Sequence, residues 1–193
     1  NGSGKSTLLK TLINDDIAYL NQEISHEFDN MSILEFIKKE INLDVLENKL
    51  HELENNLNDL ELYSEVLNKF LELDGYCIEN NLLNIMNGLN LNKDLETKIK
   101  ILSGGEKIKV LLCALILKNK PILFLDEPTN NLDLDAINWL ENFLIKSKKK
   151  MIIVSHDEVF LNNIVNKIFE LKDGKIKEYN VGYNDYLIIK DKE

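Results

Sequence analysis

Residues 122–133 read ILFLDEPTNNLD, an apolar run that ends in two adjacent carboxylates and a turn. A short apolar run of this kind is typical of a buried strand in a parallel sheet. Open α/β sheets bind ligands at the carboxyl ends of their strands, so Asp126 and Glu127 are expected at such an edge. Asp126 suits Mg²⁺ binding, directly or through water, and Glu127 suits the polarisation of an attacking water as a general base. The alternative is an ordinary acidic strand end. The turn sequence that follows directly, residues 128–133, argues against this alternative.

A second apolar run, residues 151–154 (MIIV), predicts another buried strand further along the chain. His156 follows this run directly and should therefore emerge at the same edge of the sheet. There its imidazole could hydrogen-bond a terminal phosphate. A lone histidine is more often a surface or core residue, and we interpret His26 and His51 as surface residues.

The chain begins with NGSGKST, the last seven positions of the phosphate-binding pattern G-x-x-x-x-G-K-[ST], whose first glycine would lie two residues before Asn1. Glycines let successive backbone N–H groups turn inward around phosphates, at the positive end of the helix that follows. Lys5 would reach the outer phosphates and the Ser6 hydroxyl would bind Mg²⁺. A Gly/Ser linker that runs into a helix is the alternative. The predicted phosphate-binding residues are Asn1, Gly2, Ser3, Gly4, Lys5, Ser6 and Thr7.

Strands that alternate with helices predict an α/β fold with a mostly parallel sheet flanked by helices. A strand is expected at residues 17–20, and a helix capped by Asp133 and running to about Ile145. We expect Cys113 and Trp139 to pack in the core.

Residues 23–101 have a helical sequence pattern, unlike the alternating strands and helices predicted for the rest of the chain. Leucines at spacings of 4 and 3 between Leu46 and Leu67 predict helices, with a break near Asn56. These helices either pack within a helical layer or form a projecting hairpin. The chain thus divides into a core, residues 1–22 and 102–193, and an inserted α-helical subdomain, residues 23–101.

The net charge of −10 comes from 33 acidic residues against 23 lysines, and there is no arginine. Such a composition argues against a free-standing nucleic-acid binder, which usually carries a basic face. The segment 23–101 alone holds 17 acidic residues and 7 lysines, so the excess acid belongs to the helical insert. Two cysteines make no disulfide framework, which favours a reducing, cytoplasmic setting. The longest apolar run, residues 110–117, is too short to span a bilayer.

The motifs resemble, in order, those of the ATP-binding cassette (ABC) ATPases, a family with the P-loop NTPase fold. The matching features are the phosphate loop, Gln22, residues 102–106 (LSGGE), Asp126 with Glu127, and His156. Within that family, residues 126–133 (DEPTNNLD) resemble the F subfamily's D-E-P-T-N-H-L-D. Residues 155–161 and 179–186 also look like that subfamily, and residues 138–141 resemble the first of its two cassettes.

The resemblance implies a site for ATP and Mg²⁺ in which Glu127, His156 and Gln22 are catalytic and Ser6, Gln22 and Asp126 bind the metal. A second cassette, in the same full-length chain or in a homodimer, would share the ATP. The residues implied to contact the partner's ATP are Ser103, Gly104, Gly105 and Asp133, the last within a loop formed with Asn131 and Leu132.

The function implied is that of a cytoplasmic ATPase acting on the ribosome, as a translation factor or in antibiotic-resistance ribosome protection, without direct membrane insertion. The alternative is the ATP-binding subunit of an ABC membrane transporter, disfavoured by the 80 positions from Gln22 to Leu102 and by residues 179–186. A non-hydrolysing, degraded cassette is a further alternative. A chromosome-structure ATPase head of the SMC type would need very long coiled coils, for which there is no room.

Three departures from the F-subfamily pattern stand out. Asn131 replaces a usual His, Glu158 replaces a usual Arg, and Lys5 and Gln22 are only 17 positions apart, shorter than the family's usual gap. We therefore expect the 193-residue chain alone to bind ATP weakly and to hydrolyse almost none. Because the acidic insert would repel a phosphate backbone, ribosome contact is expected from segments outside this sequence, such as a linker after Glu193.

Overall fold

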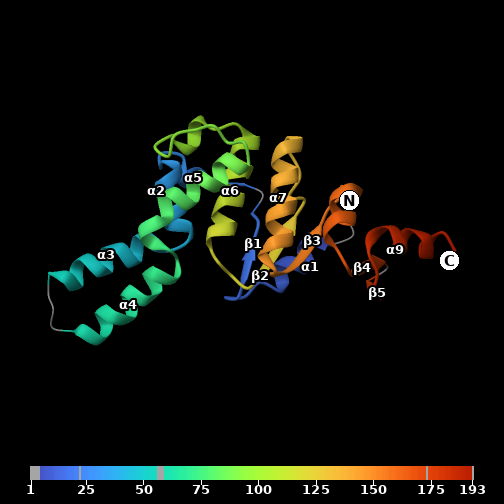
Figure 1. The fold of residues 1–193 in the computed structure, drawn as a ribbon, viewed down its shortest axis with the longest axis horizontal. Coiled ribbons are helices and arrows are strands. Elements are labelled where there is room, and N and C mark those ends of the chain that lie inside the picture. Colours follow the sequence, from blue (N-terminus) through green and yellow to red (C-terminus); the bar gives the residue numbers. More distant parts are fainter. Residues whose placement is uncertain (1–4, 22, 56–58, 173, 193) are drawn as a thin grey trace. The chain divides into compact units, whose positions relative to one another are not determined.

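In a computed structural model, the chain folds as two compact units. The first comprises Asn1–Leu20 with Pro121–Glu193, and the second comprises Asn21–Lys120 (Figure 1). The structure describes residues 5–21, 23–55, 59–172 and 174–192, apart from the side chain of Ser6.

The first unit is α/β, as predicted. Its strands form a parallel sheet of order β1-β2-β3 and a separate antiparallel hairpin of β4 with β5. The described elements are α1 (Lys5–Thr11), β1 (Ile17–Tyr19), β2 (Ile122–Asp126), α7 (Leu134–Ser147), β3 (Lys150–Val154), α8 (Glu158–Ile164), β4 (Ile168–Lys172), β5 (Lys175–Tyr179) and α9 (Tyr183–Lys190).

Strand β2 is the centre of the parallel sheet. Leu123 and Leu125 are fully buried, as is typical of a strand that has a paired neighbour on each side in a parallel sheet. Strand β3 differs from the prediction of a second buried strand. It lies at the edge of the described sheet, and Ile152 is 37% exposed.

The second unit is helical among its described residues. Ser32 and Ser103 each begin a helix with a reciprocal capping box, and Asp59 caps α4 through the Leu62 N–H. The elements are η1 (His26–Phe28), α2 (Ile33–Glu40), α3 (Leu43–Glu54), α4 (Leu60–Glu72), η2 (Gly75–Cys77), α5 (Ile78–Gly88), η3 (Ile99–Ile101) and α6 (Gly104–Leu117).

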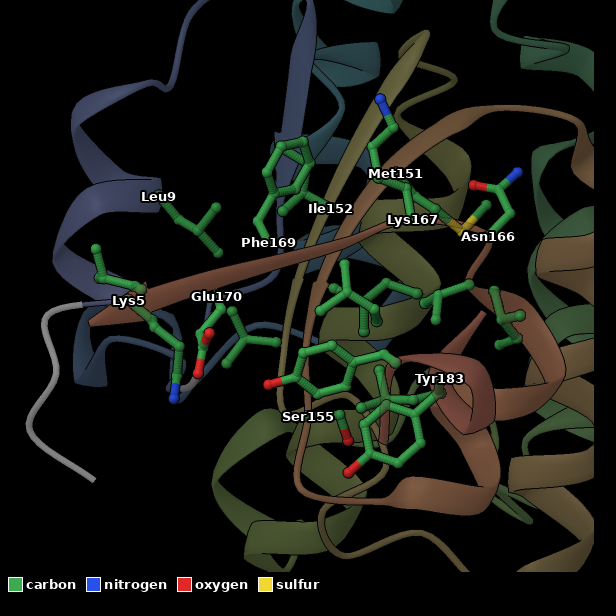
Figure 2. Close-up of a pocket in the computed structure, with 18 of the residues that line it drawn as sticks. Lys5, Leu9, Met151, Ile152, Ser155, Asn166, Lys167, Phe169, Glu170 and Tyr183 are labelled. Atoms are coloured by element: carbon green, nitrogen blue, oxygen red, sulfur yellow. The ribbon is translucent and has the colours of Figure 1, made fainter. Parts of the chain in front are cut away.

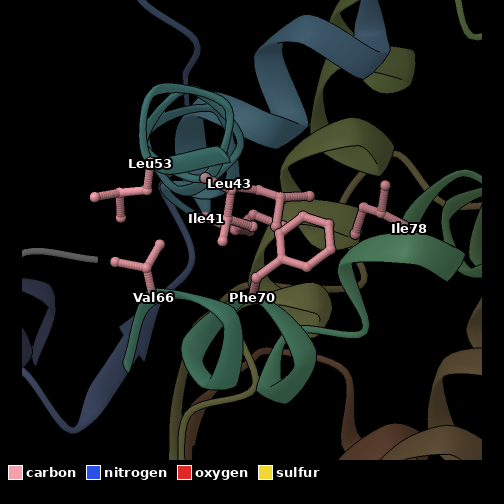
Figure 3. Close-up of a cluster of buried hydrophobic side chains, with 7 residues drawn as sticks. Ile41, Leu43, Leu53, Val66, Phe70 and Ile78 are labelled. Carbon is pink, nitrogen blue, oxygen red and sulfur yellow. The ribbon is translucent and has the colours of Figure 1, made fainter. Parts of the chain in front are cut away.

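Helices α3 and α4 pack against each other and extend from α2, α5 and α6 as a hairpin (Figure 1). Their core contains Leu50 and Leu53 of the predicted leucine stripe. Leu53 on α3 lies opposite Val66 on α4, and Phe70 reaches Leu43 (Figure 3). At the start of α4, by contrast, Leu60 is 69% exposed. The buried members of this cluster are Ile41, Leu43, Leu50, Leu53, Val66, Phe70 and Ile78.

The compact units differ from the sequence-based division at α6. This helix groups with the helical unit, whereas the sequence motifs assign residues 102–193 to the core. The motif-based domains therefore stay a prediction. Helix α6 ends at Leu117, and Asn119 two residues later adopts φ +48°, a left-handed value that does not continue the helix. Of the helices described, none is long and apolar enough to cross a membrane.

Candidate functional site

Glu127 takes an unusual backbone conformation directly after β2. Its φ is +51°, a left-handed value that costs a residue with a Cβ roughly 1–3 kcal/mol. Its backbone N–H donates to the carbonyl of Val154 at 2.7 Å, which ties the turn to the end of β3. The strained turn therefore holds the Glu127 carboxylate where β2 and β3 end, and such strain is concentrated at functional sites.

His156 meets Glu127 at this edge, as the sequence predicted. The backbone N–H of His156 donates to Oε2 of Glu127 at 3.1 Å, and imidazole Nε2 lies 3.4 Å from Oε1. The Glu127 side chain is 18% exposed and the His156 side chain 65% exposed. A carboxylate that is held by the backbone and still reached by solvent can polarise a water molecule.

Asp126 ends β2 inside the protein, only 3% exposed. The hydroxyl of Tyr19 donates to its Oδ2 at 3.5 Å. Burial raises the pKa of the Tyr19 phenol, and the negative charge of Asp126 raises it further. Tyr19 was not among the predicted site residues. The available signal was the parallel register, in which Tyr19 pairs with Phe124, two residues before Asp126.

The donor set at this edge suits Mg²⁺. Among the described side chains there is no group of three His, Cys, Asp or Glu that could hold a metal by themselves. A buried carboxylate such as Asp126 supplies one hard oxygen, and Mg²⁺ typically takes one or two carboxylates with substrate phosphates and waters. The other two predicted ligands, Gln22 and the side chain of Ser6, lie outside the described residues.

The predicted phosphate loop is described only from Lys5 onward. Asn1, Gly2, Ser3 and Gly4 lie outside the described residues, whereas Lys5 begins α1 and Thr7 is exposed. Lys5 lines a pocket of about 920 Å³ with residues of α1, β3, β4, α8 and α9, including Leu9, Phe169 and Tyr183 (Figure 2). Ser155 also lines this pocket, but Glu127 and His156 do not.

Asp133 caps α7 by accepting the Ala136 N–H at 3.0 Å, as predicted. Asn131, two residues earlier, takes φ +62° and is exposed, so this turn also has a left-handed residue. Residues 127–133 thus form an ordered turn between β2 and α7.

Ser103, Gly104 and Gly105 belong to the second unit, at the start of α6. The Ser103 hydroxyl accepts the Glu106 N–H at 3.3 Å, and the Glu106 carboxylate accepts the Ser103 N–H at 2.8 Å. A Cβ added at Gly104 would meet nothing within 4 Å. Packing inside this unit therefore does not require a glycine there, and the exposed helix start is open to an approaching group.

His26, His51, Cys113 and Trp139 make contacts away from this edge of the sheet. His26 is exposed, with Nδ1 3.1 Å from Asp29 Oδ2, and His51 is exposed on α3. Cys113 is fully buried in α6, and burial raises the pKa of its thiol strongly. Trp139 is half-buried and stacks on Phe143 with ring centroids 5.5 Å apart.

Comparison with known proteins places this arrangement in a family. Residues 1–130 match the sequence profile of the ABC transporter family. The chain belongs to this family of ATP-binding cassettes. Nearly whole-length matches include ABC transporter F family member 2 of Arabidopsis thaliana, 31% identical over 98% of this chain and 32% of that protein. ATP-binding protein Uup of Haemophilus influenzae is 32% identical over 99% of this chain and 32% of its own length.

The chain spans about a third of the length of these curated relatives. The alignment with the Arabidopsis protein extends over 217 positions against the 193 residues of this chain, so that relative carries additional residues within the matched region.

Solved structures confirm the ABC ATPase fold. The ATP-binding subunit of an ABC transporter superposes with a TM-score of 0.69 and 16% identity, over 100% of this chain and 85% of that one. An archaeal ribosome recycling factor, solved with a ribosomal stalk protein, superposes with a TM-score of 0.61 and 21% identity, over 98% of this chain and 35% of that one. At these identities the likeness concerns the fold.

Proposed function

We propose that this ABC cassette hydrolyses ATP within a longer F-type protein that acts on ribosomes. The observation that carries the enzymatic part is the contact between Glu127 and His156 where β2 and β3 end. The ribosomal part rests on the likeness to F-type relatives over nearly the whole chain.

In the proposed reaction, Glu127 takes a proton from the attacking water through its carboxylate, which is 18% exposed. His156 donates a hydrogen bond to the terminal phosphate, and its backbone N–H keeps Glu127 in place throughout. Mg²⁺, held by Asp126 with Ser6 and Gln22, would neutralise phosphate charge when bound.

The second part of the proposed site comes from a partner cassette. The exposed start of α6, with Ser103, Gly104 and Gly105, offers backbone N–H groups and a positive helix end to the phosphates of ATP bound elsewhere. In a chain without arginine, these donors take the place of an arginine finger. We expect residues 1–193 alone to hydrolyse almost no ATP.

Binding to ribosomes can be tested with the full-length protein carrying Glu127→Gln, which should hold ATP without cleaving it. Pelleting through a sucrose cushion should recover this variant with ribosomes when ATP is present and not when it is absent. A Lys5→Ala version should stay in the supernatant, because Lys5 is proposed to hold the phosphates. No ATP-dependent pelleting, together with co-purification of a membrane permease, would instead favour a transporter subunit.

A further inference from the structure

The carboxylate of Glu106 is shared between Ser103 and a lysine from outside α6. On Oε2 it accepts the Ser103 N–H at 2.8 Å and the Ser103 hydroxyl at 2.9 Å. On Oε1 it pairs with Lys93 Nζ at 3.1 Å. Both oxygens at the start of the helix are therefore engaged, each by a different residue.

The loop that carries Lys93 is fixed against the rest of the helical unit. Lys109, buried on α6, donates from Nζ to the carbonyl of Asn90 at 3.2 Å. At the other end of the loop, the backbone N–H of Ile33 donates to Thr97 at 3.0 Å. Lys93 is thus presented to Glu106 from a loop anchored on both sides of it.

A negative charge at the start of α6 creates a conflict. Hydrogen bonds from Ser103, first from its backbone and then from its hydroxyl, lower the pKa of Glu106, and Lys93 lowers it further, so Glu106 is ionised at neutral pH. In the free cassette this charge suits the helix dipole. It would repel the triphosphate that, under the proposed function on which this inference rests, Ser103 and Gly104 contact.

The ion pair is too exposed to matter much for stability. The side chains of Lys93 and Glu106 are 32% and 28% exposed. Pairs at such positions contribute little to folding, because water screens them and their long side chains lose entropy. The position of Lys93 thus has more bearing on the charge at the helix start than on the fold.

We propose that Lys93 is a positioning residue for phosphate binding at the start of α6. It neutralises Glu106 from Oε1, and its positive charge weakens the hold of the carboxylate on the Ser103 hydroxyl at Oε2. The Ser103 hydroxyl can then turn its hydrogen from Glu106 to the γ-phosphate of ATP held by a partner cassette. Lys93 acts through Glu106 and Ser103 and need not touch the phosphate.

The test is a double-mutant cycle in the full-length protein, with ATP hydrolysis as the readout. Lys93→Met should raise the ATP concentration for half-maximal rate about tenfold, the order expected for one uncompensated charge near a polyphosphate. High salt should shrink this effect. In a Glu106→Gln background, which keeps a side-chain carbonyl for Ser103 without the charge, Lys93→Met should have little effect.

A matched control is available in the same unit. Lys98 lies 3.4 Å from Oε2 of Glu35, the carboxylate that accepts the Ser32 N–H in the capping box of α2, away from the proposed phosphate contact. Lys98→Met should leave the ATP dependence unchanged, and neither lysine variant should lower the melting temperature appreciably. An equal effect of Lys93→Met in both backgrounds, or no effect in either, would overturn the proposal.

The test also separates this inference from the proposed function. Gly104→Asp places a carboxylate at the open helix start and should abolish hydrolysis. An active Gly104→Asp variant would overturn the shared ATP site, and the role of Lys93 with it. An inactive Gly104→Asp variant with a silent Lys93→Met variant would overturn the role of Lys93 alone.

Discussion

Glu127 and His156 are joined twice at the end of the parallel sheet. The backbone N–H of His156 donates to Oε2 of Glu127 at 3.1 Å, and its Nε2 lies 3.4 Å from Oε1. One contact belongs to the main chain and survives any substitution at position 156 other than proline, whereas the other belongs to the imidazole. Substitutions can therefore separate the placement of the carboxylate from the chemistry of the ring.

Replacement of His156 by alanine should lower the rate of ATP hydrolysis about a hundredfold, within the range for a positioned proton-transfer or hydrogen-bonding group. The melting temperature should change little, because the main-chain contact to Glu127 remains. Steady-state hydrolysis by the full-length protein measures the effect. His26→Ala, which removes an exposed imidazole in the helical unit, is the control, and equal rates for the two variants would exclude a role for His156.

Replacement of Tyr19 by phenylalanine removes the hydroxyl that donates to buried Asp126. We expect a Mg²⁺ requirement for hydrolysis about tenfold higher, the size of effect found when a group that orients a metal ligand is lost. A magnesium titration of the ATPase rate measures it. The matched control is Tyr63→Phe, since Tyr63 donates to Glu54 at the same 3.5 Å far along the helical unit. Equal titration curves would mean that Tyr19 does not orient Asp126.

Gly75 begins η2 against the ring of Phe70. A Cβ at this position would lie 2.4 Å from ring atoms Cε2 and Cζ. The ring is buried and also packs edge-on against Tyr76, so it cannot swing aside freely. Gly75→Ala should destabilise the protein by about 1–3 kcal/mol, as overpacking of a core does.

Urea denaturation of the Gly75→Ala variant gives this free energy. Phe70→Leu shortens the obstructing side chain, so the same glycine substitution should cost less in that background. A cost that is the same with Phe70 and with Leu at position 70 would rule out the steric explanation.

Glu35 should contribute to the loss of folding stability at acidic pH. A hydrogen bond from the Ser32 backbone, followed by the Lys98 side chain, lowers the pKa of Glu35 below its unfolded value of about 4.3. The contribution to stability is therefore complete above that pH and is lost as pH falls through the lower, folded pKa. Glu35→Gln should flatten this part of the stability–pH curve, whereas Glu65→Gln, at an exposed site on α4, should leave the curve as it is. Denaturation midpoints between about pH 2 and 6 provide the comparison.

The parallel sheet, and the placement of Glu127 and His156 at the same edge of it, were predictable from the sequence. Both depend on short apolar runs that are followed directly by polar residues. When such runs pair as parallel strands, the polar residues that follow them lie at the same edge of the sheet. Tyr19 was missed because its contact depends on the register of β1 against β2. Lys93 was missed because its contact depends on how a loop folds back on α6, which no local pattern specifies.

The exposure of β3 was predicted wrongly. Residues 151–154 are as apolar as the buried run in β2, and apolarity alone does not tell an edge strand from a central one. The leucine spacing predicted the helices α3 and α4 but left open whether they pack within a layer or form a hairpin. Exposed Leu60 shows that the leucine stripe extends past the contact between these helices.

The central claim is that Glu127 activates the water that attacks ATP. Its most direct test is Glu127→Gln in the full-length protein, since the amide oxygen can still accept the His156 N–H while the base is lost. The account predicts that this variant retains bound ATP and shows almost no turnover, whereas Glu158→Gln, at the start of α8, turns over ATP like the unchanged protein. Hydrolysis by Glu127→Gln at the normal rate would contradict it.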